Sequence, residues 1–169
     1  MNQTRNAGGG PSGTPASLFW RWERFTAIAV SASFLLNAMW EMAQMSAYVE
    51  TARQSWSSTL GLCTRAAVGD VVMSLGIYAG GALAAGDPGW GLRGRWNIYA
   101  TAAVLGLALA ALVEHAALAA GRWSYSGRMP LVSVLGAGLW PLLQMTLLPS
   151  LSLLLARWCA GPSATRGSS

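Results

Sequence analysis

Three carboxylic acids, Glu41, Asp70 and Glu114, lie within long apolar stretches of the sequence. A charged side chain at membrane depth costs at least ~2.5 kcal/mol, so each acid must be paired, hydrated or functional. A buried carboxyl that holds its proton can donate it, and an ionised neighbour can take it back. Because the three acids stand at similar distances from the ends of their stretches, they predict one buried site for general acid–base chemistry.

The polar residues around the acids supply the other members of this predicted site. In the first stretch they recur every three or four residues, which places them on one face of a helix. Arg65 is expected to neutralise and tune the acids, whereas Glu114 and His115 are expected to relay protons. The predicted catalytic residues are Glu41, Asp70, Glu114, His115 and Arg65. The predicted substrate-binding residues are Asn37, Trp40, Gln44, Tyr48, Tyr78, Arg122, Trp123, Tyr125, Trp140 and Gln144.

Other chemistries fit these residues less well. Adjacent side chains such as Glu114 and His115 point about 100° apart on a helix, which disfavours a metal site built from them and the other two acids. The chain has one histidine, which excludes a haem held by two. Cys63 and Cys159 form no CxxC motif and fall at opposite membrane faces. We therefore predict no metal and no cofactor.

The composition indicates what kind of fold must hold these residues. Of 169 residues, 53% are apolar and 10% are charged, and the mean hydropathy is +0.40. A soluble domain carries about 25% charged residues, so this chain has too few to cover its surface. Four apolar stretches are each long enough to cross a bilayer core of ~30 Å. We predict an all-α antiparallel bundle of four transmembrane helices at about 25–48, 65–85, 98–120 and 131–156.

The ends of the chain and its arginines predict the orientation of this bundle. Residues 1–18 form a flexible tail rich in Gly, Pro, Ser and Thr, residues 19–158 form the transmembrane domain, and residues 159–169 form a second tail. Seven of the eleven arginines fall on the side of the two tails, which places both termini in the cytoplasm. The arginines form no basic run, so we expect membrane lipids as partners and no nucleic acid.

Small residues and one proline predict how the helices pack. Pro141 is expected to free the carbonyl of Ala137 and to kink the fourth helix. Two ridges of small residues at four-residue spacing are expected to let neighbouring helices approach closely in lipid. The ridges are Gly76, Gly80 and Ala84 in the second stretch and Ala102, Gly106 and Ala110 in the third.

The motifs of this chain resemble those of known membrane families. WExxQ at 40–44, CxRxxxGD at 63–70 and GRWxYxxxMP at 121–130 look like those of a group of small, largely uncharacterised bacterial four-helix membrane proteins. This likeness covers most of the chain after the first tail. It implies the fold and a bacterial cytoplasmic (inner) membrane, but no established activity.

Two further resemblances suggest chemistry. The Glu-x-x-Gln, Arg and Asp of the first two stretches are similar to the pattern of VanZ-like glycopeptide-resistance proteins. The gap from Gln44 to Arg65 is longer than in that pattern, and Ser74 stands near where an Asn is expected. An acid followed by Gly-x-Trp-x-Tyr and a proline loosely resembles the integral-membrane carotenoid cyclases and hydratases. That likeness implies protonation of an alkene by buried carboxyl groups.

Three functions from different classes stay open at this point. The first is an enzyme that modifies an isoprenoid or another lipophilic substrate by general acid–base chemistry, as a lyase, isomerase or cyclase. The second is a noncatalytic subunit or assembly factor of a larger membrane complex, since the chain has almost no soluble mass. The third is a small transporter or proton pathway, for which four helices require a homo-oligomer. A polar network that only fixes the register of the helices accounts for the same residues.

Overall fold

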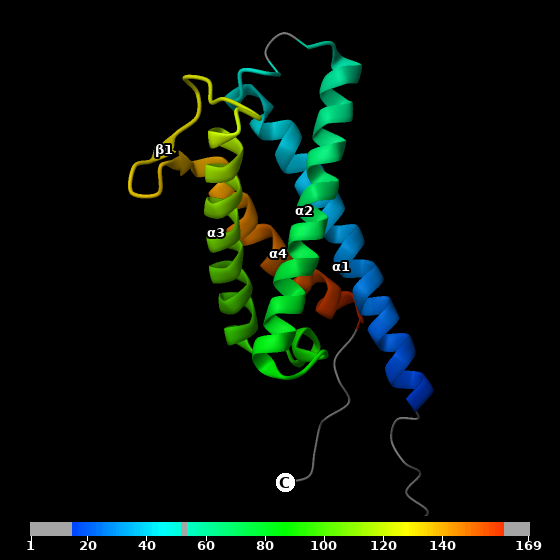
Figure 1. Cartoon of the computed structure of the whole chain (residues 1–169). Helices are drawn as coiled ribbons and strands as arrows, with labels where there is room; N and C mark the ends of the chain where they lie inside the picture. The colour runs from blue at the N-terminus through cyan, green and yellow to red at the C-terminus, as the bar shows by residue number, and fades with distance from the viewer. Residues whose placement is uncertain (1–14, 52–53, 161–169) are drawn as a thin grey trace, which may run out of the picture.

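Four long helices make up most of the computed structural model, which describes residues 15–51 and 54–160. They are α1 (Pro15–Gln44), α2 (Trp56–Ala85), α3 (Trp96–Ala119) and α4 (Leu139–Ala160). Figure 1 shows them running alternately in opposite directions, so that the start of α1 and the end of α4 lie at the same end of the bundle. Each helix is long and apolar enough to cross a membrane. The predicted all-α bundle is confirmed, and the chain is a multi-pass membrane protein.

Short elements connect these helices. The 3-10 turn η1 (Met45–Ala47) continues α1, and η2 (Trp90–Arg93) lies between α2 and α3. A two-stranded antiparallel hairpin of β1 (Leu131–Val132) and β2 (Ala137–Gly138) precedes α4, with Leu131 opposite Gly138. The predicted tails lie mostly outside the described residues.

Local side-chain and backbone signals set the ends of α2. Ser55 caps its first turn, because its hydroxyl accepts a hydrogen bond from the Ser58 N–H at 3.3 Å. Gly86 ends the helix in a left-handed conformation with φ 61°, which only glycine adopts without strain. The Asp87 carboxylate then accepts a hydrogen bond from the Gly89 N–H at 3.0 Å. These bonds reverse the chain toward α3.

The fourth helix begins at Leu139, later than the start at 131 that hydropathy predicts. Residues 131–138 form the hairpin instead, and Gly136 within it has a left-handed φ of 58° that a helix excludes. Pro141 therefore lies in the first turn of α4, where a missing N–H costs nothing. The prediction that Pro141 frees the Ala137 carbonyl and kinks the helix is wrong.

The proline inside α4 is Pro149, and its effect reaches the neighbouring helix. Pro149 has no N–H to donate to the carbonyl of Met145, four residues earlier. Gly106 of α3 lies directly against that carbonyl, and a Cβ at this position would collide with it. Ala102 and Ala110, one turn away on either side, are buried as well. The small ridge predicted on α3 is therefore confirmed as the place where α3 and α4 approach closely.

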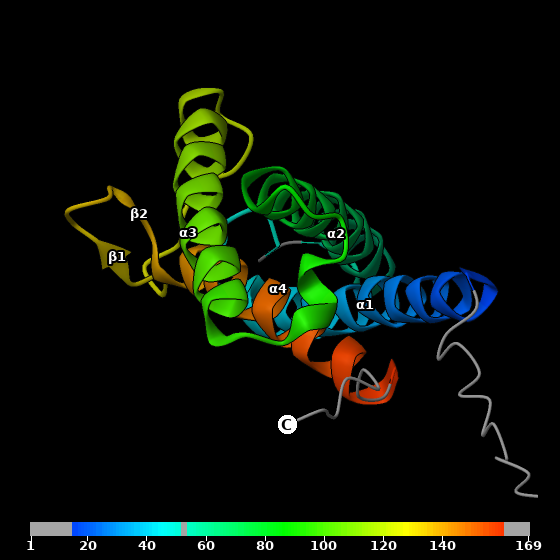
Figure 2. The same ribbon diagram turned by 90° about the horizontal axis from the view of Figure 1, so that it is seen from below.

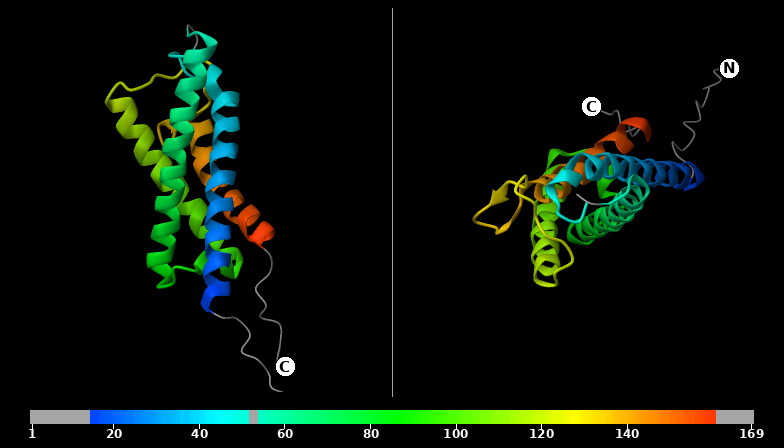
Figure 3. Two further views of the ribbon diagram at one scale, coloured as in Figure 1. Left: turned by 90° about the vertical axis from the view of Figure 1, so that its right-hand side faces the viewer. Right: turned by 90° about the horizontal axis from the view of Figure 1, so that it is seen from above.

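The other predicted ridge, on α2, is not a tight interface. Among the described residues, a Cβ added at Gly76 would meet nothing within 4 Å, and one at Gly80 would meet only Leu105 at 3.8 Å. Figure 2 shows α4 between α1 and α3, while α2 lies beside α1. Figure 3 shows α3 leaning away from α2 toward the end of the bundle that carries the α3–α4 connection. The backbones of α2 and α3 therefore diverge at that end.

Candidate functional site

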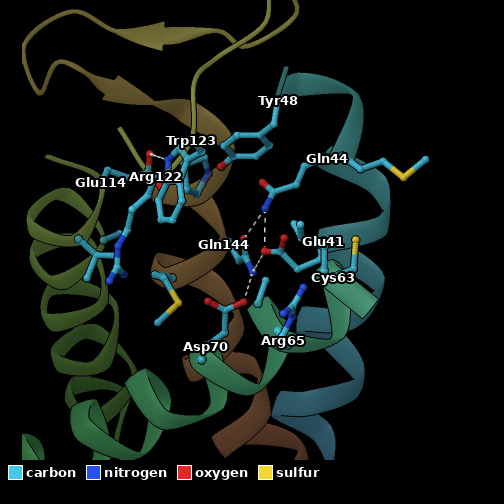
Figure 4. A pocket seen from close by; sticks show the side chains of 18 of the residues that line it. Glu41, Gln44, Tyr48, Cys63, Arg65, Asp70, Glu114, Arg122, Trp123 and Gln144 are labelled. Atoms are coloured by element: carbon cyan, nitrogen blue, oxygen red, sulfur yellow. Dashed lines mark hydrogen bonds between the residues drawn. The ribbon is translucent and has the colours of Figure 1, made fainter. Parts of the chain in front are cut away.

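A cavity of about 790 Å³, lined by residues of all four helices, lies at this end of the bundle, and Figure 4 shows it from close by. Its volume is in the range of small-ligand sites, roughly 300–1,000 Å³. Apolar side chains, among them Leu62, Met73, Val113 and Met145, supply part of its wall. Its polar lining residues are Glu41, Gln44, Tyr48, Glu50, Thr51, Cys63, Arg65, Asp70, Glu114, Arg122, Trp123 and Gln144.

Gln144 of α4 joins three helices at the inner wall of this cavity (Figure 4). Its Nε2 lies 2.9 Å from Asn37 Oδ1, 2.9 Å from Glu41 Oε1 and 2.7 Å from Asp70 Oδ2. Its Oε1 accepts a hydrogen bond from Gln44 Nε2 at 2.9 Å. Because Asn37, Gln144 and Gln44 are almost fully buried, these bonds lie in a low-dielectric environment that strengthens them.

The network around Gln144 has more acceptors than hydrogens. A side-chain amide carries two N–H hydrogens, but Gln144 Nε2 faces three oxygens. Gln44 Nε2 uses its own two hydrogens on Gln144 Oε1 and on Glu41 Oε1 at 2.8 Å. One oxygen of Glu41 and one of Asp70 lie on the same Gln144 nitrogen, so the two carboxyl groups are neighbours. One proton shared between these two carboxyls would supply the missing hydrogen.

The same network continues along α1, away from the cavity. Asn37 Nδ2 donates to the Ser33 carbonyl at 2.8 Å, and the Ser33 hydroxyl lies 3.2 Å from that of Ser74 in α2. Trp40 Nε1 donates to Gln44 Oε1 at 3.2 Å. These contacts fix the orientation of the amides that hold the two acids.

Glu114 reaches the cavity from α3 and belongs to a separate set of hydrogen bonds. Its Oε2 accepts from the Tyr125 hydroxyl and, at 3.4 Å, from Trp123 Nε1. The Tyr125 oxygen in turn accepts from the Gly138 N–H at 2.9 Å. Burial raises the pKa of the Tyr125 phenol above its usual value, and the hydrogen bond to Glu114 acts in the same direction. Glu114 therefore holds a protonated phenol and, through it, the α3–α4 connection.

Two chain segments, residues 45–51 and 121–126, form a cap over the end of the cavity. An antiparallel β-bridge pairs Tyr48 with Tyr125. Glu50 Oε1 accepts hydrogen bonds from the N–H and the hydroxyl of Ser124 at 2.8 and 2.9 Å. The rings of Tyr48 and Trp123 meet edge to face, with centroids 6.4 Å apart. The cap therefore closes the cavity at the end of the bundle.

The opening of the cavity lies on the flank of the bundle, between α2 and α3. Three residues both line the cavity and are exposed: Arg65 and Gly69 of α2, and Arg122 of the cap. A Cβ added at Gly69 would meet no described atom within 4 Å. The exposed part of the lining therefore lies on the α2 side and at the cap, which places the mouth on the flank of the bundle.

The structure brings most of the predicted site residues to this cavity. Asn37 and Tyr125 lie behind its wall, each hydrogen-bonded to a lining residue. The predicted residues that line the cavity directly are Glu41, Gln44, Tyr48, Arg65, Asp70, Glu114, Arg122, Trp123 and Gln144. Their roles in catalysis and binding stay predictions.

Two of the predicted catalytic residues do not make the expected contacts. His115 is exposed and does not line the cavity; its ring lies near Gly136 of the hairpin. Adjacent residues of a helix point about 100° apart, so when the Glu114 side chain points into the cavity, that of His115 points outward. The ion pair found among the described residues is Arg93–Asp87 at 2.8 Å. Arg65 therefore forms none with these acids, contrary to the expectation that it neutralises one.

Three predicted binding residues also lie outside the cavity lining. Trp40 and Trp140 pack edge to face, with centroids 6.4 Å apart, on the side of the bundle formed by α1 and α4. Tyr78 lies at the opposite end of α2, where its hydroxyl donates to the Pro88 carbonyl at 2.6 Å. Helical spacing places these residues on plausible faces, but it does not reveal which faces meet the cavity.

Sequence reasoning missed Glu50 and the methionines of the wall. Glu50 follows the first apolar stretch, where a charged residue is ordinary, and no local signal links it to Ser124, its partner 74 positions later. Its Oε2 atom is buried and has no hydrogen-bond partner among the described residues. Met73 and Met145 also line the cavity, and nothing in the sequence indicates this because a methionine in an apolar stretch is common.

Neither metal chemistry nor similarity to other proteins narrows the function further. Within residues 15–51 and 54–160, no group of three or more His, Cys, Asp or Glu side chains is placed to hold a metal ion. No protein-family model, curated protein or solved structure matches the chain. The family resemblances of the motifs therefore stay predictions. Fold and site together define a four-helix membrane protein with an acid-lined cavity that opens on its flank.

Proposed function

We propose that the protein is a membrane-embedded enzyme that acts on an isoprenoid or another lipid by general acid–base chemistry. The observation that carries the proposal is the acid pair, Glu41 and Asp70, held by one amide of Gln144 at the wall of a cavity of about 790 Å³. The sideways mouth of this cavity suits a substrate that arrives from the bilayer rather than from water.

The acid pair supplies both a proton donor and a proton acceptor. Two neighbouring carboxyls in a poorly hydrated site do not both ionise, so the pair holds one proton. In a double-bond shift, the protonated carboxyl donates to one alkene carbon, and the ionised carboxyl removes a proton from the carbon next to the cationic centre. The pair then again holds one proton, so the reaction is balanced without a co-reactant.

Aromatic side chains of the cap are suited to the charge that develops in such a reaction. Protonating an alkene creates a carbocation, and the face of an indole or phenol ring attracts cations. Trp123 and Tyr48 line the cavity and lie edge to face. In this proposal they face the developing cation, whereas Trp40 and Trp140, two of the predicted binding residues, do not line the cavity.

We further propose a bacterial cytoplasmic membrane with both termini in the cytoplasm. The start of α1 and the end of α4 share one end of the bundle (Figure 1), and that end carries the larger share of the arginines, as cytoplasmic loops do. The cavity and its cap then lie in the non-cytoplasmic half.

The test measures transfer of solvent deuterium to carbon. The full chain is reconstituted in phosphatidylcholine vesicles that contain polyprenols, menaquinone and carotenes, incubated in D2O, and its lipids are analysed by mass spectrometry. We expect wild-type protein to label one class of these lipids. Because general acid–base groups contribute roughly 10²–10⁴-fold, E41Q and D70N should each lower the rate by at least about a hundredfold.

The control is E23Q, which changes an exposed glutamate of the same helix outside the cavity. It should label lipids at the wild-type rate. Equal labelling by wild type, E41Q and D70N would show that the acid pair has no chemical role. Absence of label from every lipid class with wild-type protein would also remove the proposal.

A noncatalytic subunit of a larger membrane complex is the second candidate. The observation that favours it is the first part of α1, which extends beyond the other helices (Figure 1) and exposes Phe19 and Trp20 by 60% and 68%. Copurification distinguishes the two functions. A stoichiometric protein partner that detergent does not strip, and that F19A/W20A releases, would favour the subunit.

A further inference from the structure

Two arginines line the cavity without an acidic partner. Figure 4 shows Arg65 reaching into it from α2 and Arg122 reaching down into it from the cap. Across the described part of the chain, the ion pair is Arg93–Asp87, at the other end of the bundle. Arg65 and Arg122 therefore each bring a positive charge to the cavity that no described carboxylate pairs.

The acids of the cavity, in contrast, have donors from the chain itself. Glu114 accepts from Tyr125 and Trp123. Glu50 accepts from Ser124, and the acid pair accepts from Gln144. Each of these acids has at least one donor from the chain, although Glu50 Oε2 has no partner among the described residues, whereas neither guanidinium group has an acidic partner there.

The depth of Arg65 strengthens this argument. It lies nine residues after Trp56, the first residue of α2, which is about 13 Å along the helix axis. It is exposed on the flank of the bundle. Because α2 has 30 residues, about 45 Å, it is longer than a bilayer core of ~30 Å, so Arg65 falls near the boundary of that core. An exposed guanidinium at this level is suited to the acidic head group of a lipid.

We propose that the cavity binds an amphiphile with an acidic head group, a phosphate or a carboxylate, and that Arg65 and Arg122, on two sides of the cavity (Figure 4), supply the positive charge that attracts it. Guanidinium groups bind both anions through pairs of parallel hydrogen bonds. The apolar chain of the ligand leaves between α2 and α3, along Leu62, Met73 and Val113. This inference rests on the proposed function for the role of the cavity as a substrate site, and it narrows the substrate class to acidic lipids.

Cys63 provides a reporter of whether the cavity is occupied. It lines the cavity, and the other cysteine of the chain, Cys159, is exposed at the end of α4. In a C159A background, alkylation of Cys63 by N-ethylmaleimide is followed by mass spectrometry of the full chain in phosphatidylcholine nanodiscs. The probes are dioleoyl phosphatidic acid, oleate, the neutral dioleoylglycerol and inorganic phosphate.

We expect phosphatidic acid and oleate to slow alkylation of Cys63 at least about fivefold, and dioleoylglycerol to leave it unchanged. R65Q and R122Q should each raise about tenfold the concentration of phosphatidic acid that halves the alkylation rate, because each variant loses one charge-assisted contact. R65K keeps the charge but not the paired hydrogen bonds, so it should recover part of the protection that R65Q loses. The control R128Q changes an exposed arginine of the same connection that does not line the cavity, and it should protect as wild type does.

A second measurement is independent of the reactivity of Cys63. Native mass spectrometry of the detergent-purified chain should show phosphatidic acid retained in preference to dioleoylglycerol, and R65Q and R122Q should lose this preference. Equal binding of dioleoylglycerol, or equal losses in R128Q, would overturn the proposal. Protection by inorganic phosphate alone, with no gain from an acyl chain, would support the anion site and overturn the lipid as its source.

Failure of this inference can be separated from failure of the proposed function. E41Q and D70N leave both arginines in place, so they should retain phosphatidic acid even if they lose deuterium transfer. Retention of acidic lipid by a wild-type protein that labels no lipid would leave the head-group site standing and remove the acid–base enzyme. Deuterium transfer to a neutral lipid at a rate that R65Q leaves unchanged would support the acid–base enzyme and remove the head-group site.

Discussion

Gln144 Nε2 lies 2.7 Å from Asp70 Oδ2 and thereby joins α4 to α2, two helices that otherwise touch sparsely. The same nitrogen reaches Glu41 of α1 at 2.9 Å. One uncharged side chain of α4 therefore sets the distance between two acids, Glu41 of α1 and Asp70 of α2. An amide is suited to this position because it donates to the carboxyls without adding a charge that would compete with the proton between them.

Removing this amide should destabilise the bundle. In Q144L, two of the three oxygens around Nε2 lose a donor and the Gln44 amide loses an acceptor, so the free energy of unfolding should fall by about 3 kcal/mol. Unfolding in mixed dodecyl maltoside and SDS micelles measures this change. The control T64A removes an exposed hydroxyl that bonds only within α2 and should change stability by less than about 0.5 kcal/mol. Equal stability of Q144L and wild type would show that the network does not hold the helices together.

The helices and one part of this network follow from the sequence. Hydropathy finds all four helices because their length and composition dominate the signal. The i, i+3 spacing of Glu41 and Gln44 places both on one face, and the structure joins them at 2.8 Å. Local rules of helix geometry suffice for these features.

The rest of the site depends on contacts between distant segments, which periodicity does not encode. The bond of Tyr125 to Glu114 needs a connection that folds back over the bundle. The late start of α4 depends on the left-handed Gly136 of the hairpin. Whether Arg65 pairs with an acid depends on where α2 and α3 diverge. The spacing of residues within α2 does not predict the position of that divergence.

The contact of Gly106 with the Met145 carbonyl predicts opposite effects of one substitution at two glycines. G106A places a methyl group against backbone that cannot yield, so it should lower the free energy of unfolding by about 2 kcal/mol. G76A adds the same methyl group where no described atom lies within 4 Å, and it should stabilise α2 by about 0.5–1 kcal/mol. The same detergent unfolding assay compares them. Stabilisation by G106A would show that α3 and α4 are farther apart than described.

Tyr125 predicts a loss of stability at high pH. Burial raises the pKa of its phenol, so the folded chain keeps a proton that an unfolded tyrosine loses near pH ~10. Above that pH the unfolded state binds fewer protons than the folded state, and the free energy of unfolding therefore falls as pH rises. Unfolding of wild type and Y125F between pH 8 and pH 11 should show a smaller fall in Y125F. Identical pH slopes would contradict the burial of this hydroxyl.

Y125F should also loosen the α3–α4 connection at neutral pH, because the Gly138 N–H and Glu114 lose a shared partner. Hydrogen–deuterium exchange of residues 121–138 should become at least about tenfold faster, equivalent to roughly 1.4 kcal/mol. The control is Y99F, since the Tyr99 hydroxyl is buried without a hydrogen-bond partner in the described part of the chain. Y99F should leave exchange in this connection unchanged.

The cysteines test the proposed orientation. Cys159 is exposed at the end of α4 that shares a side with the start of α1. A membrane-impermeant maleimide should label it in inverted vesicles and not in intact spheroplasts. A cysteine introduced as S57C, in the exposed first turn of α2 at the other end, should show the reverse pattern. Labelling of Cys159 from outside would place the cap and the cavity in the cytoplasmic half.

The mouth of the cavity lies on the flank of the bundle, between α2 and α3, so a lipid ligand reaches it from the bilayer. Its effective concentration is therefore its concentration among the membrane lipids. A molecule that reaches Arg65 through the acyl chains is diluted by other lipids, not by the volume of buffer around the vesicles. Occupancy should then follow the ligand's mole fraction in the bilayer and stay constant when the suspension is diluted. A binding curve for this protein should therefore be plotted against the mole fraction of ligand in the bilayer, not against its concentration in the buffer.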